Sequence, residues 1–199
     1  MVDNSQQTLF LIQQVQPGDL EQFDLTFNLM VEDNMILKIN EQWKDQKVDL
    51  QQVCFFKQIF SIENPIDFNR LTSIMDVNES KIIDLTNPNS LKLFNIQEFN
   101  PDLLKVQETV QGLLTHNFNM NTAIFASLNK NGISENHFDK ESVFLIPTYG
   151  LVNYVLYEGE KFIKSFQLEV GDLLIIPKTV NHSAIPLCPR IVVSVGIYN

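Results

Sequence analysis

Cysteine and histidine are scarce in this 199-residue chain, which contains two cysteines and three histidines. Cys54 and Cys188 lie far apart in the sequence and form no C-x-x-C pair, so the chain has neither a disulfide framework nor a zinc knuckle. We therefore expect both side chains to be reduced thiols, as in a cytoplasmic protein.

Basic residues and long apolar runs are also few. The chain has 14 Lys and Arg against 24 Asp and Glu, a net charge of −10, which argues against a nucleic-acid partner and favours a basic target such as a Lys- or Arg-rich peptide. No run approaches the roughly 20 apolar residues of a membrane span, and the first residues lack the features of a secretion signal. We expect a cytoplasmic protein without a membrane partner.

The first part of the chain contains short apolar clusters with helical spacing. The spacing predicts a helix over 49–60 and a second, short helix within 65–77, which begins with Pro65. The clearest helix is predicted over 101–115, where Asn100 is a suitable N-cap and a proline occupies the first turn.

From about residue 121 the pattern changes to short apolar runs separated by turn residues. These runs cover 122–128, 142–150, 151–157, 161–170, 172–177 and 190–198. Many short strands at regular spacing are typical of a β-sandwich or barrel. We therefore predict one domain, 1–199, that is mainly β with some α, in which a mixed part, 1–120, covers a β-rich core, 121–199.

Two of the three histidines fall within the β-rich part. On a strand, His137 and Asp139 would project to the same side, because alternate residues share a face. His182 is the candidate for a third ligand, and two imidazoles with one carboxylate form the set that binds non-haem Fe(II) with open coordination positions. Taken alone, the H-x-D tripeptide is more typical of a histidine that only forms structural hydrogen bonds than of a metal ligand; the motifs around it favour the ligand.

The order of motifs around these residues resembles a known family. His137-Phe138-Asp139 is followed by an apolar strand, 143–146, then by Gly150, the L-x-x-G-D-x-L-x-I-P segment 168–177, His182 and a closing S-V-G strand, 194–196. This pattern, over about 90–199, is similar to the JmjC-type cupins, and among them to the ribosomal-oxygenase branch of the 2-oxoglutarate-dependent oxygenases (cupin_4-like). The resemblance implies a double-stranded β-helix, also called a jelly-roll or cupin fold, with N-terminal helical and mixed elements packed on it.

The resemblance also implies the metal ligands and catalytic residues, which are His137, Asp139 and His182. The co-substrate site departs from the family pattern. A Lys or Arg that commonly anchors the distal carboxylate of 2-oxoglutarate is replaced by Val152, and two positions on the preceding strand that offer polar donors in relatives are Ala123 and Phe125. An aliphatic side chain cannot neutralise a buried carboxylate.

Several residues are candidates to compensate in binding the co-substrate. Arg190, at the start of the last strand, is suited to a bidentate pair with a carboxylate, although it is equally compatible with a solvent-facing position. Ser134, Tyr149, Asn153 and Ser194 are further candidates, and each of them also fits an ordinary turn or strand position.

The leading hypothesis is an Fe(II)- and 2-oxoglutarate-dependent dioxygenase that hydroxylates a protein side chain or a small molecule. One alternative is a metal-dependent cupin that does not use 2-oxoglutarate, such as an isomerase or a dioxygenase whose substrate chelates the metal; Val152 favours it. The other is a non-catalytic cupin binding module, since a fold alone does not decide function. The sequence leaves the substrate and the oligomeric state, including a homodimer, open.

Overall fold

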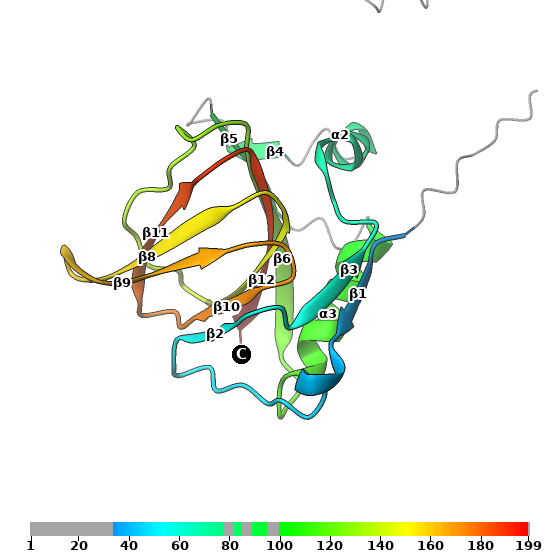
Figure 1. Cartoon of the computed structure of the whole chain (residues 1–199), viewed down its shortest axis with the longest axis horizontal. Helices are drawn as coiled ribbons and strands as arrows, with labels where there is room; N and C mark the ends of the chain where they lie inside the picture. The colour runs from blue at the N-terminus through cyan, green and yellow to red at the C-terminus, as the bar shows by residue number, and fades with distance from the viewer. Residues whose placement is uncertain (1–33, 78–81, 85–88, 95–99, 199) are drawn as a thin grey trace, which may run out of the picture. The chain divides into compact units, whose positions relative to one another are not determined.

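Antiparallel strands are the main elements of the computed structural model, which describes residues 34–77, 82–84, 89–94 and 100–198 (Figure 1). The chain divides between Asp33 and Asn34, so that all described residues belong to one unit. A seven-stranded sheet has the order β2-β10-β7-β12-β6-β5-β4, and a three-stranded sheet has the order β11-β8-β9. A small third sheet pairs β1 with β3.

The element bounds are as follows. The seven-stranded sheet contains β2 (Cys54–Phe56), β4 (Ile82–Asp84), β5 (Ser90–Phe94), β6 (Asn119–Ser127), β7 (Ser142–Tyr149), β10 (Leu173–Ile176) and β12 (Arg190–Tyr198). The three-stranded sheet contains β8 (Val152–Glu158), β9 (Lys161–Leu168) and β11 (Asn181–Pro186), and the small sheet contains β1 (Ile36–Ile39) and β3 (Phe60–Glu63). The helices are η2 (Glu41–Trp43), α2 (Phe68–Val77) and α3 (Pro101–Gly112).

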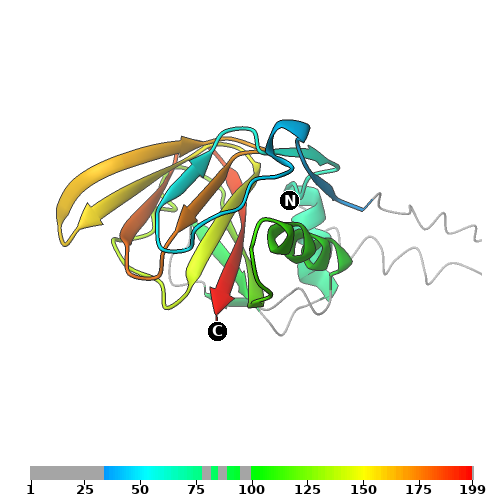
Figure 2. The same ribbon diagram turned by 90° about the horizontal axis from the view of Figure 1, so that it is seen from below.

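The seven-stranded sheet is apolar on both faces because each face is covered. On one face Ile124 and Val193 belong to the same apolar cluster as Val106 of α3. On the other face Leu145 and Val192 pack in a second cluster with residues of the three-stranded sheet. Figure 2 shows α2 and α3 together on the side of the large sheet that lies opposite the β8–β9 hairpin. The predicted double-stranded β-helix with helical elements packed on it is confirmed.

The six predicted strand runs correspond to β6, β7, β8, β9, β10 and β12. Strand β11, which carries His182, has no counterpart among them. Strands β2, β4 and β5 precede residue 121 in the sequence but extend the same sheet as β6. The predicted division into a covering part, 1–120, and a β-rich core, 121–199, stays a prediction. None of the helices among the described residues has the length and apolar character of a membrane span.

The predicted helix over 49–60 is wrong, because this segment is bonded to distant strands. Its residues form β2, which pairs with β10, and then lead into β3. Between the two strands Gln58 has a φ of 50°, and its backbone N–H donates to the carboxylate of the buried Asp172 at 2.8 Å. The helical spacing of apolar residues therefore does not lead to a helix, because contacts with β10 and with the Gly171-Asp172 turn hold this segment in an extended form.

The two other predicted helices are confirmed. Helix α2 lies within the predicted range 65–77, and the Asp67 carboxylate accepts the Arg70 backbone N–H at its first turn at 2.9 Å. Helix α3 begins after Asn100, whose side chain accepts the N–H groups of the first turn as predicted. It ends at Gly112, three residues earlier than predicted, and the Lys47 ammonium donates to the Gly112 carbonyl at 2.6 Å.

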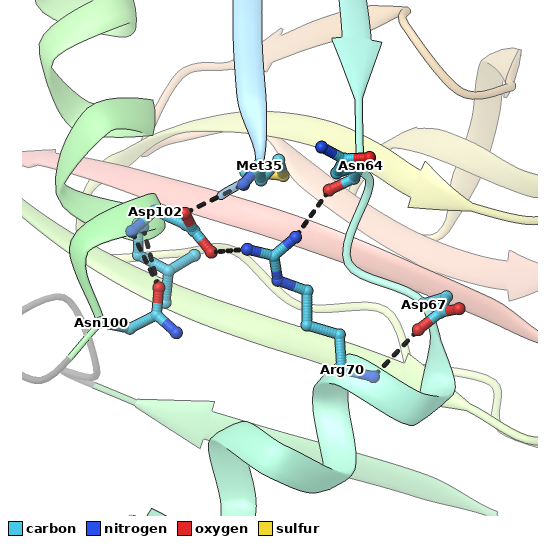
Figure 3. A network of polar contacts seen from close by, with 7 residues as sticks. Met35, Asn64, Asp67, Arg70, Asn100 and Asp102 are labelled. Carbon is cyan, nitrogen blue, oxygen red and sulfur yellow. Dashed lines mark hydrogen bonds and ion pairs between the residues drawn. The ribbon is translucent and has the colours of Figure 1, made fainter. Parts of the chain in front are cut away.

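A buried ion pair joins the helices to the start of β1 (Figure 3). Asp102, 3% exposed, contacts the Arg70 guanidinium through one carboxylate oxygen. Its other oxygen accepts the Met35 backbone N–H at 3.0 Å, and Arg70 also donates to the Asn64 carbonyl at 2.9 Å. The Arg70–Asp102 pair thus connects α3, α2, the residue before β1 and the residue after β3.

We predict that Asp102→Ala lowers the free energy of unfolding by about 3–5 kcal/mol, because it removes one partner of a buried charge pair. Urea unfolding followed by circular dichroism measures the loss. Lys38→Ala is the control: its pair with Glu63 is more than half exposed on both sides, and we expect a loss below about 1 kcal/mol. Equal losses for the two variants would contradict the role given to Asp102.

Candidate metal centre and its pocket

His137 and His182 lie directly opposite each other on two antiparallel segments. The His137 N–H donates to the His182 carbonyl at 3.0 Å, and the His182 N–H donates to the His137 carbonyl at 2.7 Å. Residues paired in this way place their side chains on the same face, and the two ring centroids are 4.5 Å apart. The sequence pattern predicts a strand at His137. In the structure His137 instead lies in a loop that forms an isolated bridge to β11.

Asp139 completes a group of three potential ligands. Its carboxylate oxygens lie 3.7 Å from His137 Nε2 and 3.5 Å from His182 Nε2. One ligand atom from each of the three residues lies within 4.8 Å of the others. The structure therefore brings together the three residues that the resemblance implied as ligands, and their donor set is the two-histidine, one-carboxylate set of mononuclear metal sites.

Hydrogen bonds orient both imidazole rings toward this common point. His137 Nδ1 is 2.7 Å from the Glu135 carbonyl, and His182 Nδ1 is 3.1 Å from the Val180 carbonyl. Because a carbonyl only accepts, Nδ1 carries the proton in each ring and Nε2 keeps its lone pair. Burial lowers the pKa of His182, which favours the neutral, ligating form.

The residues that precede the two histidines hold the turn between β8 and β9. The side-chain amides of Asn136 and Asn181 both donate to the Gly159 carbonyl, at 3.0 and 3.5 Å. Gly159 has a φ of +61°, which favours glycine at this turn. The hairpin is thus attached to both segments that carry the histidine ligands.

The three ligands line a cavity of about 540 Å³ between the two sheets. His182 is 4% exposed, whereas the side chains of His137 and Asp139 are 46% and 34% exposed. One side of the metal position is therefore buried in the barrel and the other faces the cavity mouth. A small molecule has access to the metal position without unfolding of the sheets.

Arg190 lines the same cavity and carries a buried charge. The residue is 3% exposed, and among the residues placed in the structure its Nε and Nη1 meet no hydrogen-bond acceptor. Burial lowers the pKa of Arg190, although an arginine stays charged at neutral pH. A buried guanidinium without acceptors is costly, so its side chain is suited to an anion that enters the cavity.

Glycine at position 150 allows the approach that places Arg190. Gly150 has a φ of +74°, and a Cβ atom built there would lie 2.0 Å from the Pro189 carbonyl oxygen and 3.0 Å from Arg190 Cα. Any side chain at this turn would therefore displace the start of β12. The glycine of the sequence motif has a packing role beside the buried arginine.

The other predicted co-substrate residues divide into two groups. Ser134 and Ser194 line the cavity, and Ser134 Oγ is 3.3 Å from His137 Nδ1. Tyr149 is 42% exposed, and its ring packs against Phe68 outside the described lining. Asn153 faces away from the cavity, because it alternates on β8 with two buried residues. A co-substrate role for these four residues stays a prediction, and the geometry favours the two serines.

Tyr154 is a cavity residue that the sequence analysis missed. It is 3% exposed and lines the cavity, and its ring centroid lies 6.4 Å from that of His182. The strand alternation that places Val152 inside the barrel also places Tyr154 inside, so the signal was present in the sequence. Val152 is fully buried in the apolar cluster between the sheets and is not among the lining residues described.

Comparison with solved structures identifies relatives in fold. No family model matches the sequence, and no curated protein matches it. The ribosomal oxygenase YcfD from Escherichia coli, in complex with cobalt and succinic acid, is similar with a TM-score of 0.67 and 18% identity, over 82% of this chain and 53% of that chain. Its complex with cobalt and 2-oxoglutarate gives a TM-score of 0.67 and 17% identity over the same shares.

A further YcfD structure gives a TM-score of 0.65 at 18% identity and covers 83% of this chain. The chain spans about half the length of the protein it matches, since 53% of YcfD is covered. At this identity the likeness shows the fold. It confirms the fold that the resemblance implied.

We predict that His182→Ala abolishes stoichiometric binding of Fe(II) or Co(II), because it removes the most buried of the three ligands. Anaerobic calorimetric titration measures the binding, and circular dichroism checks the fold. The control is His116→Ala, which replaces an exposed histidine just beyond α3 and should leave metal affinity unchanged. Stoichiometric metal binding by the His182 variant would contradict the site.

Proposed function

We propose that this protein is an Fe(II)- and 2-oxoglutarate-dependent dioxygenase that hydroxylates a protein side chain or a small molecule. One observation carries the proposal: His137, Asp139 and His182 share a cavity with a buried Arg190 whose guanidinium has unused donors. A metal position and an anion position in one cavity suit a ligand that chelates a metal and also carries a distant carboxylate.

The residues present fit an octahedral metal ion such as Fe(II). Two imidazole nitrogens and one carboxylate oxygen supply three ligands and leave further positions open. When bound, iron would activate O₂, which is the oxidant: one oxygen atom would go to the substrate C–H bond, and the other to 2-oxoglutarate, which would lose CO₂ and become succinate. The protein's own part is to hold the ligands, orient the reactants and exclude water.

The described side chains divide this work between them. The backbone pair of the two histidines, with the Nδ1 hydrogen bonds, holds the Nε2 atoms in place. Arg190 binds the distal carboxylate in a charge-assisted pair. Apolar side chains such as Phe125 and Leu145 line the cavity and limit the water in it.

A protein substrate is the finer part of the proposal. YcfD is a ribosomal oxygenase, and the net charge of −10 of this chain suits a basic peptide. We place this activity in the cytoplasm, in keeping with the two free thiols.

A metal-dependent cupin that does not use 2-oxoglutarate is the second candidate. The burial of Val152 in an apolar cluster favours it, because the basic anchor of relatives is absent at this position. Anaerobic titration with Fe(II) and then 2-oxoglutarate, followed by measurement of succinate in air, separates the two. Binding of both ligands with succinate formation supports the dioxygenase. Iron binding without any response to 2-oxoglutarate contradicts it and favours the second candidate.

We predict that Arg190→Met weakens 2-oxoglutarate binding about 10- to 100-fold, the loss expected for hydrogen bonds to a charged group. The variant should be as stable as the parent or more stable, because it removes a buried charge that lacks acceptors. Anaerobic calorimetry and thermal unfolding measure the two effects. Lys161→Met, on the exposed strand β9, is the control and should bind 2-oxoglutarate normally. Normal binding by the Arg190 variant would mean that another residue holds the acid.

A further inference from the structure

Tyr154 and Arg190 face the same cavity from opposite walls of the barrel. Tyr154 belongs to β8 of the three-stranded sheet, and Arg190 is the first residue of β12 in the seven-stranded sheet. Both residues are 3% exposed and both line the cavity. A ligand in this space would therefore meet a phenol from one sheet and a guanidinium from the other.

The polar atoms of both side chains have unused hydrogen-bonding capacity. None of the described residues forms a hydrogen bond with the Tyr154 hydroxyl, and the same holds for Arg190 Nε and Nη1. Tyr157 provides the contrast on the same strand, since its hydroxyl lies 3.1 Å from Ser183 Oγ. Buried phenols usually find a partner, so the Tyr154 hydroxyl is available for a ligand.

The Tyr154 side chain shares its cavity with Arg190 and with the three candidate metal ligands. Burial raises the pKa of Tyr154, the positive charge of Arg190 opposes this rise, and the negative charge of Asp139 adds to it. A tyrosine phenol is protonated at neutral pH in any case and is a hydrogen-bond donor. Both side chains are then donors, and a carboxylate is an acceptor that suits two donors at once.

The strand register places Tyr154 nearer to the metal ligands than the family's usual anchor. On β8, Val152 pairs with Pro186, Tyr154 pairs with Ala184 and Leu156 pairs with His182. Val152 and Tyr154 are successive inward-facing residues of β8, about 6.6 Å apart along the strand. Tyr154 is the one closer to His182. The level of Val152 is filled by apolar side chains, where a carboxylate would be unpaired.

We propose that Tyr154 and Arg190 form a two-walled clamp for the distal carboxylate of a 2-oxo dicarboxylic acid. The inference rests on the proposed function and assigns a specificity-determining role to Tyr154. The clamp distinguishes 2-oxo dicarboxylic acids from 2-oxo monocarboxylic acids, because only the former present an acceptor to both donors. In relatives the basic residue that binds this carboxylate stands at the position of Val152. In this chain the carboxylate would bind at the level of Tyr154, which lies nearer to the metal ligands along β8.

The test compares two acids of equal chain length, 2-oxoglutarate and 2-oxopentanoate, which lacks the distal carboxylate. Binding is measured by calorimetry on Fe(II)-loaded protein without oxygen, so the result does not depend on turnover. We expect Tyr154→Phe to weaken 2-oxoglutarate binding about 10- to 100-fold, the range for a hydrogen bond to a charged group. Binding of 2-oxopentanoate should be unchanged, since the aromatic ring is retained.

Tyr157→Phe is the matched control, because it removes a hydroxyl from the same strand outside the cavity. We expect it to change neither affinity, and we expect Arg190→Met to show the same selective loss as Tyr154→Phe. Equal weakening of both acids by Tyr154→Phe, or no weakening of either, would overturn the clamp while the proposed function stands. Failure of the parent protein to bind 2-oxoglutarate would overturn both.

Discussion

The backbone pair between His137 and His182 fixes the geometry on which the site depends. Its two hydrogen bonds join the loop after β6 to β11, so that residues distant in the sequence face the same point. The adjoining asparagines extend this attachment to the β8–β9 turn. Because backbone groups make the pair, the ligand positions depend on the register of the two segments rather than on side-chain packing.

The position of Arg190 is costly for folding, and this cost is itself informative. Most buried polar groups have partners, and the Arg70–Asp102 pair shows that this chain can neutralise a buried guanidinium. Arg190 lacks such a carboxylate partner among the described residues, while its cavity is also lined by the three candidate metal ligands and by Tyr154. A charge that is buried without acceptors at such a place is more consistent with ligand binding than with stability.

The β-rich part of the fold could be predicted from the sequence, because buried strands produce apolar runs between turn residues. The earlier part could not be predicted in the same way. Residues 49–60 have helical spacing, yet part of this segment forms strand β2, which pairs with β10. The Asp172 carboxylate accepts a further backbone N–H of the segment. Strand β11 was missed because its polar residues, such as Asn181 and Ser183, give no apolar run. In both cases distant partners decide the local structure.

The three residues that a motif specified lie together in the structure, whereas two of the residues chosen only for their proximity in the sequence do not line the cavity. Tyr149 and Asn153 flank Val152 in the sequence, but a strand side chain shares its face with residues two positions away. Asn153 therefore points away from the cavity, and Tyr149 lies before the turn at Gly150, which separates the two sheets. Applying strand alternation from Val152 selects Tyr154 instead. Which side chains of β8 face the cavity thus depends on the residue at which β8 begins. Strand β8 begins after the turn at Gly150, whose backbone has a left-handed conformation.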